Sequence, residues 1–238
     1  MASVLHRGRM RYCVSDIHGE YDLFTRLLER IGFSDDDEMY VCGDVLDKGE
    51  DSVRLAKLIA SLENVRCIIG NHELQFLNYY DSVMEDADNL DDEALLKLRE
   101  YFPKDAHFLD SELVEWINSL PTYIEEDDFI CVHAGVPLDS QGRLLPLEEA
   151  RVEELVYDRK FKNPDVIPKA PKCVFFGHTE TSCISGEDRI IKYLAHGVTK
   201  PRSVLDYCKI HLDTGAWRSG VLGCFCIDSL TEIYVEKK

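Results

Sequence analysis

Three apolar, strand-like runs in the first third of the sequence each lead directly into a polar loop, and helical patterns follow. The runs are residues 11–15, 39–42 and 65–69, and apolar residues recur at helical spacing over 23–31 and 53–62. A strand, a loop and a helix repeated in this order indicate parallel strands joined by crossover helices. In such sheets ligands bind at the carboxyl ends of the strands. The recurrence therefore predicts an α/β fold with its site at those ends.

Residues that can bind metal ions follow these runs. The first two form an Asp-x-His pair, whose side chains point the same way on an extended segment because alternate residues share a face. Two later strand-like runs, 129–132 and 173–176, also end in a histidine. Together these positions are Asp16, His18, Asp44, Asn71, His133 and His178. Such a mixed oxygen and nitrogen set suits hard-to-borderline divalent ions, and the absence of cysteine from it argues against a structural zinc site.

The rest of the chain contains helices first and short strands later. Residues 74–121 are expected to form helices with acidic linkers, of which the charge run 85–93 is a solvated connection. A helix is expected over 146–160. Short strands, antiparallel at the end of the chain, are expected over 189–194, 209–212, 221–227 and 232–235. The sequence shows no repeat and no clear linker, so we expect one α/β domain over residues 1–238 with two sheets packed together.

Composition narrows the classes of function. The formal charge of −18 argues against nucleic-acid binding, which depends on Lys and Arg facing phosphates. An anionic substrate must then find local positive charge, which bound cations can supply. No apolar run approaches the roughly 20 residues of a membrane span, and the basic first eleven residues lack the apolar core of an export signal. Nine cysteines show no disulfide-scaffold spacing, and those inside apolar runs are expected to be core residues, which indicates the reducing cytoplasm.

Five short motifs occur in a fixed order and carry a family resemblance. They are D-x-H-G from Asp16, G-D-x-x-D-K-G from Gly43, G-N-H-E from Gly70, H-A-G from His133 and G-H-T from Gly177. In this order they resemble the calcineurin-type metallophosphoesterases. More narrowly, they resemble the phosphoprotein-phosphatase branch, which includes bacterial and phage-lambda-type Ser/Thr phosphatases. The resemblance implies a four-layer α-β-β-α sandwich with two mixed sheets.

The resemblance also implies a site for two divalent ions. Asp44 would bridge them, with Asp16 and His18 on the first ion and Asn71, His133 and His178 on the second. Ions about 3.5–4 Å apart can share a hydroxide and clamp both oxygens of an in-line displacement at phosphorus. The implied reaction is therefore direct attack of that hydroxide on a phosphate ester. Manganese is the favoured metal, although the ligand set does not exclude iron, zinc or magnesium.

The same resemblance assigns the residues that would act on the substrate. His72 would face the leaving group as general acid, with Asp47 orienting its imidazole. The family usually has Arg where this chain has Lys48, and Arg binds phosphate bidentately where Lys offers a point charge. Arg159, after a short expected helix, matches a second phosphate clamp of this branch. Glu180 replaces the second histidine of the G-H-x-H motif found in many phosphodiesterases, which favours the phosphatase branch.

These features lead to one expected function and leave others open. The first expectation is a phosphomonoesterase acting on phosphoserine or phosphothreonine in proteins, or on a small phosphate ester. The alternative is hydrolysis of diadenosine tetraphosphate and related dinucleoside polyphosphates, which needs a groove for bases. The sequence shows no clear aromatic base clamp, although Trp217 beside the D-T-G-A turn at Asp213 could line the substrate cleft. A degenerate binding module ranks third, because no ligand is lost. The physiological substrate, the resident metal and the oligomeric state stay open.

Overall fold

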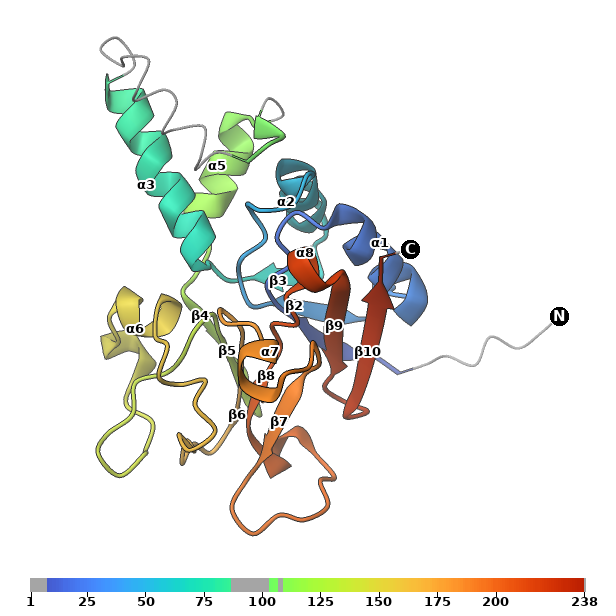
Figure 1. Ribbon diagram of the computed structural model, residues 1–238, viewed down its shortest axis with the longest axis vertical. Helices are drawn as coiled ribbons and strands as arrows, with labels where there is room; N and C mark the ends of the chain where they lie inside the picture. The colour runs from blue at the N-terminus through green and yellow to red at the C-terminus, as the bar shows by residue number, and fades with distance from the viewer. Residues whose placement is uncertain (1–7, 87–102, 107–108, 238) are drawn as a thin grey trace, which may run out of the picture.

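The computed structural model describes residues 8–86, 103–106 and 109–237, and two five-stranded sheets form its centre (Figure 1). The strands of the first sheet are β1 (Arg11–Val14), β2 (Glu38–Val41), β3 (Val65–Cys67), β9 (Val221–Cys226) and β10 (Thr231–Glu236). They are ordered β10-β9-β1-β2-β3. The three N-terminal strands run parallel, whereas β9 is antiparallel to both of its neighbours. The predicted parallel strands at the start of the chain and the antiparallel pair at its end are confirmed.

The second sheet has the same mixed character. Its strands are β4 (Tyr123–Glu125), β5 (Phe129–Val132), β6 (Cys173–Phe176), β7 (Ile191–Leu194) and β8 (Tyr207–His211). They are ordered β4-β5-β6-β8-β7, with β5, β6 and β8 parallel and the two edge strands antiparallel. The carboxyl ends of β5 and β6 lead directly into His133 and His178. Both sheets therefore deliver candidate ligands from the ends of parallel strands.

Helices cover the outer face of each sheet. The α-helices among the described residues are α1 (Tyr21–Ile31), α2 (Ser52–Ser61), α3 (Asn71–Asp86), α5 (Ser111–Asn118), α6 (Val152–Val156), α7 (Ser182–Ser185) and α8 (Ala216–Ser219). Apolar faces of α1, α2 and α5 pack on the first sheet. The second sheet is covered by α6 and the 3₁₀ turn η2 (Leu147–Glu149). A second 3₁₀ turn, η3 (Val204–Asp206), precedes β8. The α-β-β-α layering is the predicted fold class, and it is confirmed.

Side-chain alternation along the strands builds the core between the layers. On β1, Tyr12 and Val14 face the helices, whereas Cys13 faces the second sheet. On β5, Phe129 and Cys131 face the first sheet. Each sheet buries one face against the other sheet and its opposite face against helices. This burial stabilises both sheets. The predicted role of the strand cysteines as core residues is confirmed, since all of them are buried free thiols.

Some local predictions are wrong or lie outside the described residues. The expected helix over 146–160 is broken, because Ala150 and Arg151 are extended and only the short η2 and α6 are helical. The strand β4 was not predicted from the sequence. Most of the charge run 85–93 lies outside the described residues. Gly32 ends α1 in the left-handed conformation, which glycine adopts without strain.

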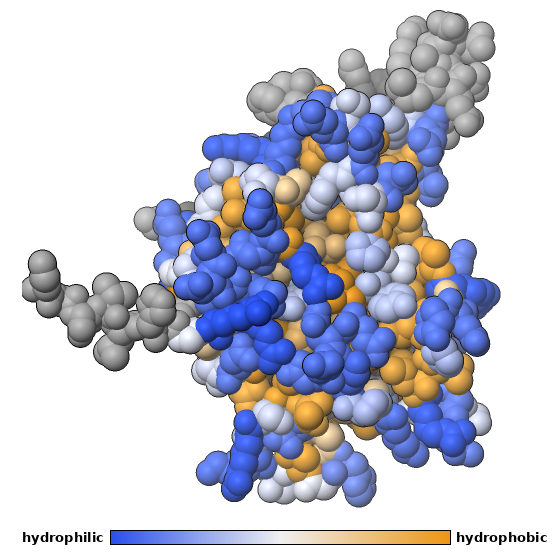
Figure 2. All heavy atoms as spheres, turned by 180° about the vertical axis from the view of Figure 1, so that it is seen from behind, coloured by the Kyte–Doolittle hydropathy of each residue, from blue (hydrophilic) through white to orange (hydrophobic). Residues whose placement is uncertain are grey.

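The surface is dominated by polar side chains. Figure 2 shows a face on which hydrophilic residues predominate and apolar residues show between them. Within the part of the chain that the structure describes, none of the helices has both the length and the apolarity that a bilayer crossing requires.

Candidate functional site

The loops after β1, β2, β5 and β6 bring the predicted metal ligands into one cluster. Asp44 lies at its centre and turns its two oxygens to different partners. Its Oδ2 is 3.4 Å from His18 Nε2, and its Oδ1 is 3.4 Å from His133 Nε2. Asp16 Oδ1 lies 3.9 Å from the same His18 nitrogen. All four side chains are almost fully buried. A carboxylate with one oxygen on each side suits a ligand shared by two ions.

The remaining two predicted ligands lie on the His133 side of this cluster. Asn71 Oδ1 is 3.0 Å from His133 Nε2 and 2.8 Å from His178 Nδ1. The two imidazole nitrogens are 3.2 Å apart. Ligand atoms about 2.1 Å from an octahedral ion lie about 3 Å from one another. The spacing of these donors therefore fits coordination of a common cation.

Hydrogen bonds fix how two of the imidazoles point. His133 Nδ1 lies 2.8 Å from the carbonyl oxygen of Cys42, and His18 Nδ1 lies 3.0 Å from that of Leu46. Because a carbonyl only accepts, each Nδ1 carries a proton and each Nε2 faces the cluster, where it can serve as a ligand once it is deprotonated. Metal-binding histidines are usually oriented in this way by a second hydrogen bond. In His178, the buried Nε2 has no hydrogen-bond partner within the described residues.

Electrostatics at the cluster favours a bound cation. Burial raises the pKa of the Asp16 carboxyl to about 7, and the charge of Asp44 adds to this effect. Burial and the charge of Asp16 likewise raise the pKa of nearby Asp213. Burial opposes a charge on His133, yet Asp44 outweighs it and raises the pKa of this imidazole to about 10. Several carboxyl groups thus lie close together in a water-poor site, where their negative charges repel one another. Bound divalent ions would reduce this repulsion.

The backbone at these positions adopts conformations that non-glycine residues rarely take. Of the seven non-glycine residues with positive φ in the described chain, all but Leu230 belong to the predicted site: Asp16, His18, Asp44, Asp47, Lys48 and His178. Strain of this kind persists where the surrounding structure enforces it, and it concentrates at functional sites. Gly70 and Gly177 allow the close packing, because a Cβ on either would overlap the carboxylate of Asp44 or Asp16.

Glu73 supports the cluster in a role that the sequence analysis missed. Its buried carboxylate accepts hydrogen bonds of 2.8–2.9 Å from the backbone amides of Asp44, Val45, Leu46 and Gly70. One side chain therefore holds the loop after β2 against the loop after β3. Its place in the G-N-H-E motif was the available signal, but the motif does not show which amides the carboxylate reaches.

His72 and Asp47 form a hydrogen-bonded pair at the edge of the cluster. His72 Nδ1 lies 2.8 Å from Asp47 Oδ2, and its ring packs edge-on against His18 with centroids 4.7 Å apart. Burial disfavours the imidazolium, but the Asp47 hydrogen bond and the charge of Asp44 raise the pKa of His72 above its ordinary 6.5. Half-buried and oriented by a carboxylate, His72 can hold a proton near neutral pH.

The two predicted phosphate contacts are held less firmly. Lys48 Nζ lies 2.9 Å from His18 Nε2 and 5.6 Å from the centre of the Trp217 ring. A cation on that nitrogen and the Lys48 ammonium exclude each other, so metal binding requires Lys48 to turn away. Arg159 lies in the exposed loop after α6. Burial lowers the pKa of His178 to about 3, and the charges of His133 and Arg159 contribute to this shift.

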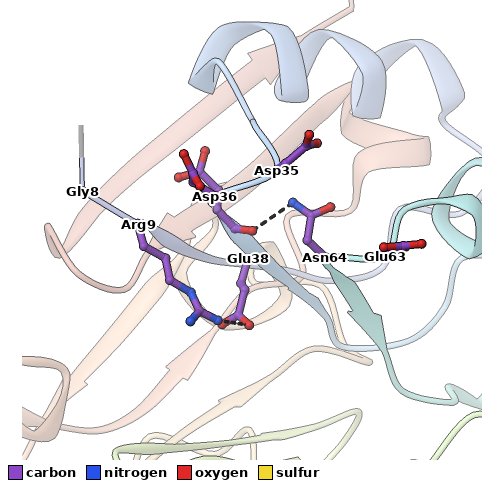
Figure 3. Close-up of a pocket in the computed structure, with 8 residues that line it drawn as sticks. Gly8, Arg9, Asp35, Asp36, Glu38, Glu63 and Asn64 are labelled. Carbon is purple, nitrogen blue, oxygen red and sulfur yellow. Dashed lines mark hydrogen bonds and ion pairs between the residues drawn. The ribbon is translucent and has the colours of Figure 1, made fainter. Parts of the chain in front are cut away.

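A hollow lies at the amino-terminal end of the first sheet, away from the ligand cluster at the carboxyl ends (Figure 3). Its lining residues precede or begin β1, β2 and β3, and most are acidic: Asp35, Asp36, Asp37, Glu38 and Glu63. Arg9, its basic member, is paired with Glu38. A surface of this charge repels phosphates, so the cluster at the carboxyl ends is the better candidate for an anionic substrate.

Sequence comparison places the cluster in a known family. The sequence model of the calcineurin-like phosphoesterases matches residues 12–210, most of the chain. The chain belongs to the calcineurin-like phosphoesterase family. Calcineurin-like metallophosphoesterases are dimetal enzymes that act on phosphate esters, and the Asp and His groups around Asp44 fit this pattern. The metal-binding character expected from the motifs is thereby supported, without an indication of which metal is used.

Curated relatives share a name. The symmetrical bis(5'-nucleosyl)-tetraphosphatase of Aggregatibacter actinomycetemcomitans is 34% identical over 134 residues, which are 54% of this chain and 45% of that protein. The protein of the same name from Vibrio parahaemolyticus is 31% identical over 129 residues, 52% and 44% of the two chains. The matched region thus spans about half the length of these relatives.

Solved structures agree on the fold. A putative diadenosine tetraphosphatase has a TM-score of 0.66 at 19% identity, covering 100% of this chain and 96% of that one. A serine/threonine phosphatase from Saccharomyces cerevisiae has a TM-score of 0.59 at 14% identity, covering 98% and 81%. At these identities, the likeness shows the shared fold alone.

The prediction of a serine/threonine protein phosphatase is wrong. The curated relatives are named as tetraphosphatases, which favours the alternative of dinucleoside polyphosphate hydrolysis. The physical reason is that the motifs of the sequence describe the buried ligand cluster. Both kinds of enzyme can use such a cluster, so the motifs do not distinguish which phosphate compound is bound.

Proposed function

We propose that this chain hydrolyses dinucleoside tetraphosphates symmetrically, releasing two nucleoside diphosphates. The observation that carries the proposal is the shared name of its curated relatives, with which it aligns over 134 and 129 residues. The clustered ligands around Asp44 supply the chemistry that such a reaction needs. Because the match covers less than half of those relatives, we treat the activity of the whole relatives as a hypothesis for this chain.

We propose two divalent ions, manganese in the first instance, as the cofactors. Asp16, His18 and Asp44 would hold one ion, and Asp44 with Asn71, His133 and His178 the other. Neighbouring side-chain atoms of the cluster lie 3.0–3.4 Å apart, close to the distance between two ligands of one ion. The orientation of the His18 and His133 rings, with Nε2 toward the cluster, also supports this assignment. When bound, such a pair stabilises the negative charge that develops around phosphorus and makes water a stronger nucleophile at neutral pH.

The other side chains would handle the substrate and the proton. Water adds its oxygen to one of the two central phosphorus atoms, and the bond from that phosphorus to the central bridging oxygen breaks. We propose that His72 gives its proton to this oxygen as it leaves with the second nucleoside diphosphate. Asp47 holds the imidazole in place through the 2.8 Å hydrogen bond. Lys48 and Arg159 would neutralise phosphate charge on either side of the cluster.

The test is a product analysis. Purified protein supplied with Mn²⁺ is incubated with diadenosine tetraphosphate, and the nucleotides are separated by anion-exchange chromatography. ADP as the sole nucleotide product supports the proposal. Formation of AMP with ATP, or no turnover by protein that hydrolyses p-nitrophenyl phosphate, would contradict it. An Asp44→Asn variant controls for contaminating hydrolases.

A further inference from the structure

A cavity of about 740 Å³ adjoins the ligand cluster on the side of Lys48. Its walls come from the start of α1, the loop before α2, and Trp217 of α8. Gly19, directly after His18, also lines it, and Lys48 joins it to the cluster through its contact with His18 Nε2. Cavities of about 300–1,000 Å³ are typical of small-molecule sites. The cavity is therefore large enough for a nucleotide, and it lies beside the proposed reaction centre.

Trp217 gives this cavity an aromatic wall. Its side chain is 40% exposed, which is unusual for the largest apolar residue. The neighbouring Arg218 anchors α8, because its guanidinium donates to Glu180 at 2.5 Å and to Asp188 at 2.7 Å. The indole ring is thus presented on a fixed element rather than on a free loop. Flat aromatic side chains of this kind stack on nucleobases.

Groups that attract an anion also line this cavity. α1 begins at the cavity without a side-chain cap, so its first amide groups are available to an anion. The start of α2 differs, because the Asp105 carboxylate accepts from the amides of Val53 and Arg54 at 3.0 Å. The Lys48 ammonium adds a charge that must leave His18 when a metal binds there. Among the acidic lining residues, Glu20 and Glu50 are already paired with lysines.

The geometry points to a binding site for the leaving nucleoside diphosphate, with the base against Trp217 and the phosphates toward Lys48 and the start of α1. The cavity lies on the His18 side of Asp44, and the proposed general acid His72 packs against that same His18 ring. Carboxylates of Asp22 and Asp51, which also line the cavity, can accept hydrogen bonds from ribose hydroxyls. This inference rests on the proposed function and names the part of the site that would select a nucleotide.

The first test compares two substrates in variants of the two tryptophans. In Trp217→Ala, the ratio of kcat/KM for diadenosine tetraphosphate to that for p-nitrophenyl phosphate should fall at least about fivefold, since one base stack is worth roughly that much or more. Trp217→Phe keeps a ring and should restore most of the ratio. Trp116→Phe is the matched control, because Trp116 packs against the helix-side core. An unchanged ratio in Trp217→Ala would overturn the inference.

The second test needs no turnover. The chain has two tryptophans, so in Trp116→Phe the fluorescence reports on Trp217 alone. ADP should quench this fluorescence in a saturable manner, whereas inorganic phosphate at equal concentration should not. Absence of saturable quenching by ADP would refute the nucleotide site. If diadenosine tetraphosphate is not hydrolysed but ADP still quenches Trp217, the proposed reaction fails and the nucleotide site stands.

Discussion

The ligand cluster and the substrate side of the site are built in different ways. Asp16, His18, Asp44 and His133 are almost fully buried, and each has further partners that fix its position. On the substrate side, Lys48 is half-buried and Arg159 is exposed, and Trp217 shows 40% of its surface. One part is enforced by two packed sheets, whereas the other depends on loops and one short helix.

This difference explains what each part can determine. A buried cluster at the ends of parallel strands sets the class of chemistry, because its donors cannot move without disrupting the sheets. We expect the exposed side to set which phosphate compound fits, because it can vary without changing the cluster. The motifs therefore indicated the reaction class correctly while the protein-phosphatase prediction failed. Substitutions in the cluster should therefore affect metal binding and turnover, whereas substitutions on the exposed side should mainly affect substrate binding.

Asp44→Asn should give the largest effect. The change removes the shared charge at the centre of the cluster, so we expect protein-bound manganese to be lost. Turnover of diadenosine tetraphosphate should fall by more than the roughly 10⁴-fold that general acid–base catalysis contributes at most. Metal analysis and initial rates measure both. Asp35→Asn, in the acidic hollow at the other end of the sheet, is the matched control. Retention of full metal content by Asp44→Asn would refute the bridging role.

His72→Asn should lower turnover by about two orders of magnitude or more while the metal content is preserved, since the proton donor alone is removed. The loss should be greater for an alkyl phosphate than for diadenosine tetraphosphate, because an alkoxide needs its proton more than a phosphate oxygen does. Steady-state kinetics with both substrates and metal analysis make the comparison. Metal loss equal to that of Asp44→Asn would show that His72 belongs to the cluster instead.

The pH profile should report the pair of His72 and Asp47. The raised pKa of His72 keeps the imidazole protonated below that value, so kcat should fall as the pH rises through a point above 6.5. Asp47→Asn removes the hydrogen bond that raises this pKa, and the falling limb should move to lower pH. A limb that stays in place in Asp47→Asn would assign it to another group.

Lys48→Arg should produce the smallest change. A guanidinium binds phosphate bidentately where the ammonium offers one point charge. We therefore expect the Michaelis constant for diadenosine tetraphosphate to fall by a small factor while kcat and metal content hold. Lys172→Arg, at the amino end of β6, is the control. Michaelis constants identical to those of the unaltered protein would show that Lys48 does not contact the phosphates.

Much of the buried part could be predicted from the sequence because its signals are local. The strands 129–132 and 173–176 were predicted with their observed bounds, since each is a continuous apolar run followed by a short histidine motif. The same runs placed His133 and His178 at strand ends, where the structure brings them to Asp44. Local patterns were sufficient there because the sheet determines where strand ends meet.

Features that arise from tertiary packing could not be predicted. The four amides bound by Glu73 come from two loops that meet only after the sheet has formed. The cavity beside Trp217 joins α1, α2 and α8, which are far apart in the sequence. The break within 146–160 depends on η2 and α6 packing separately on the second sheet. No spacing rule in one sequence encodes these contacts.

Anomalous X-ray diffraction from crystals soaked in manganese tests the central claim most directly. We predict two peaks, one on each side of the Asp44 carboxylate and about 3.5–4 Å apart. One should contact Asp16 and His18, and the other Asn71, His133 and His178. A single peak, or peaks that do not share Asp44, would contradict a two-metal centre built from these strand ends.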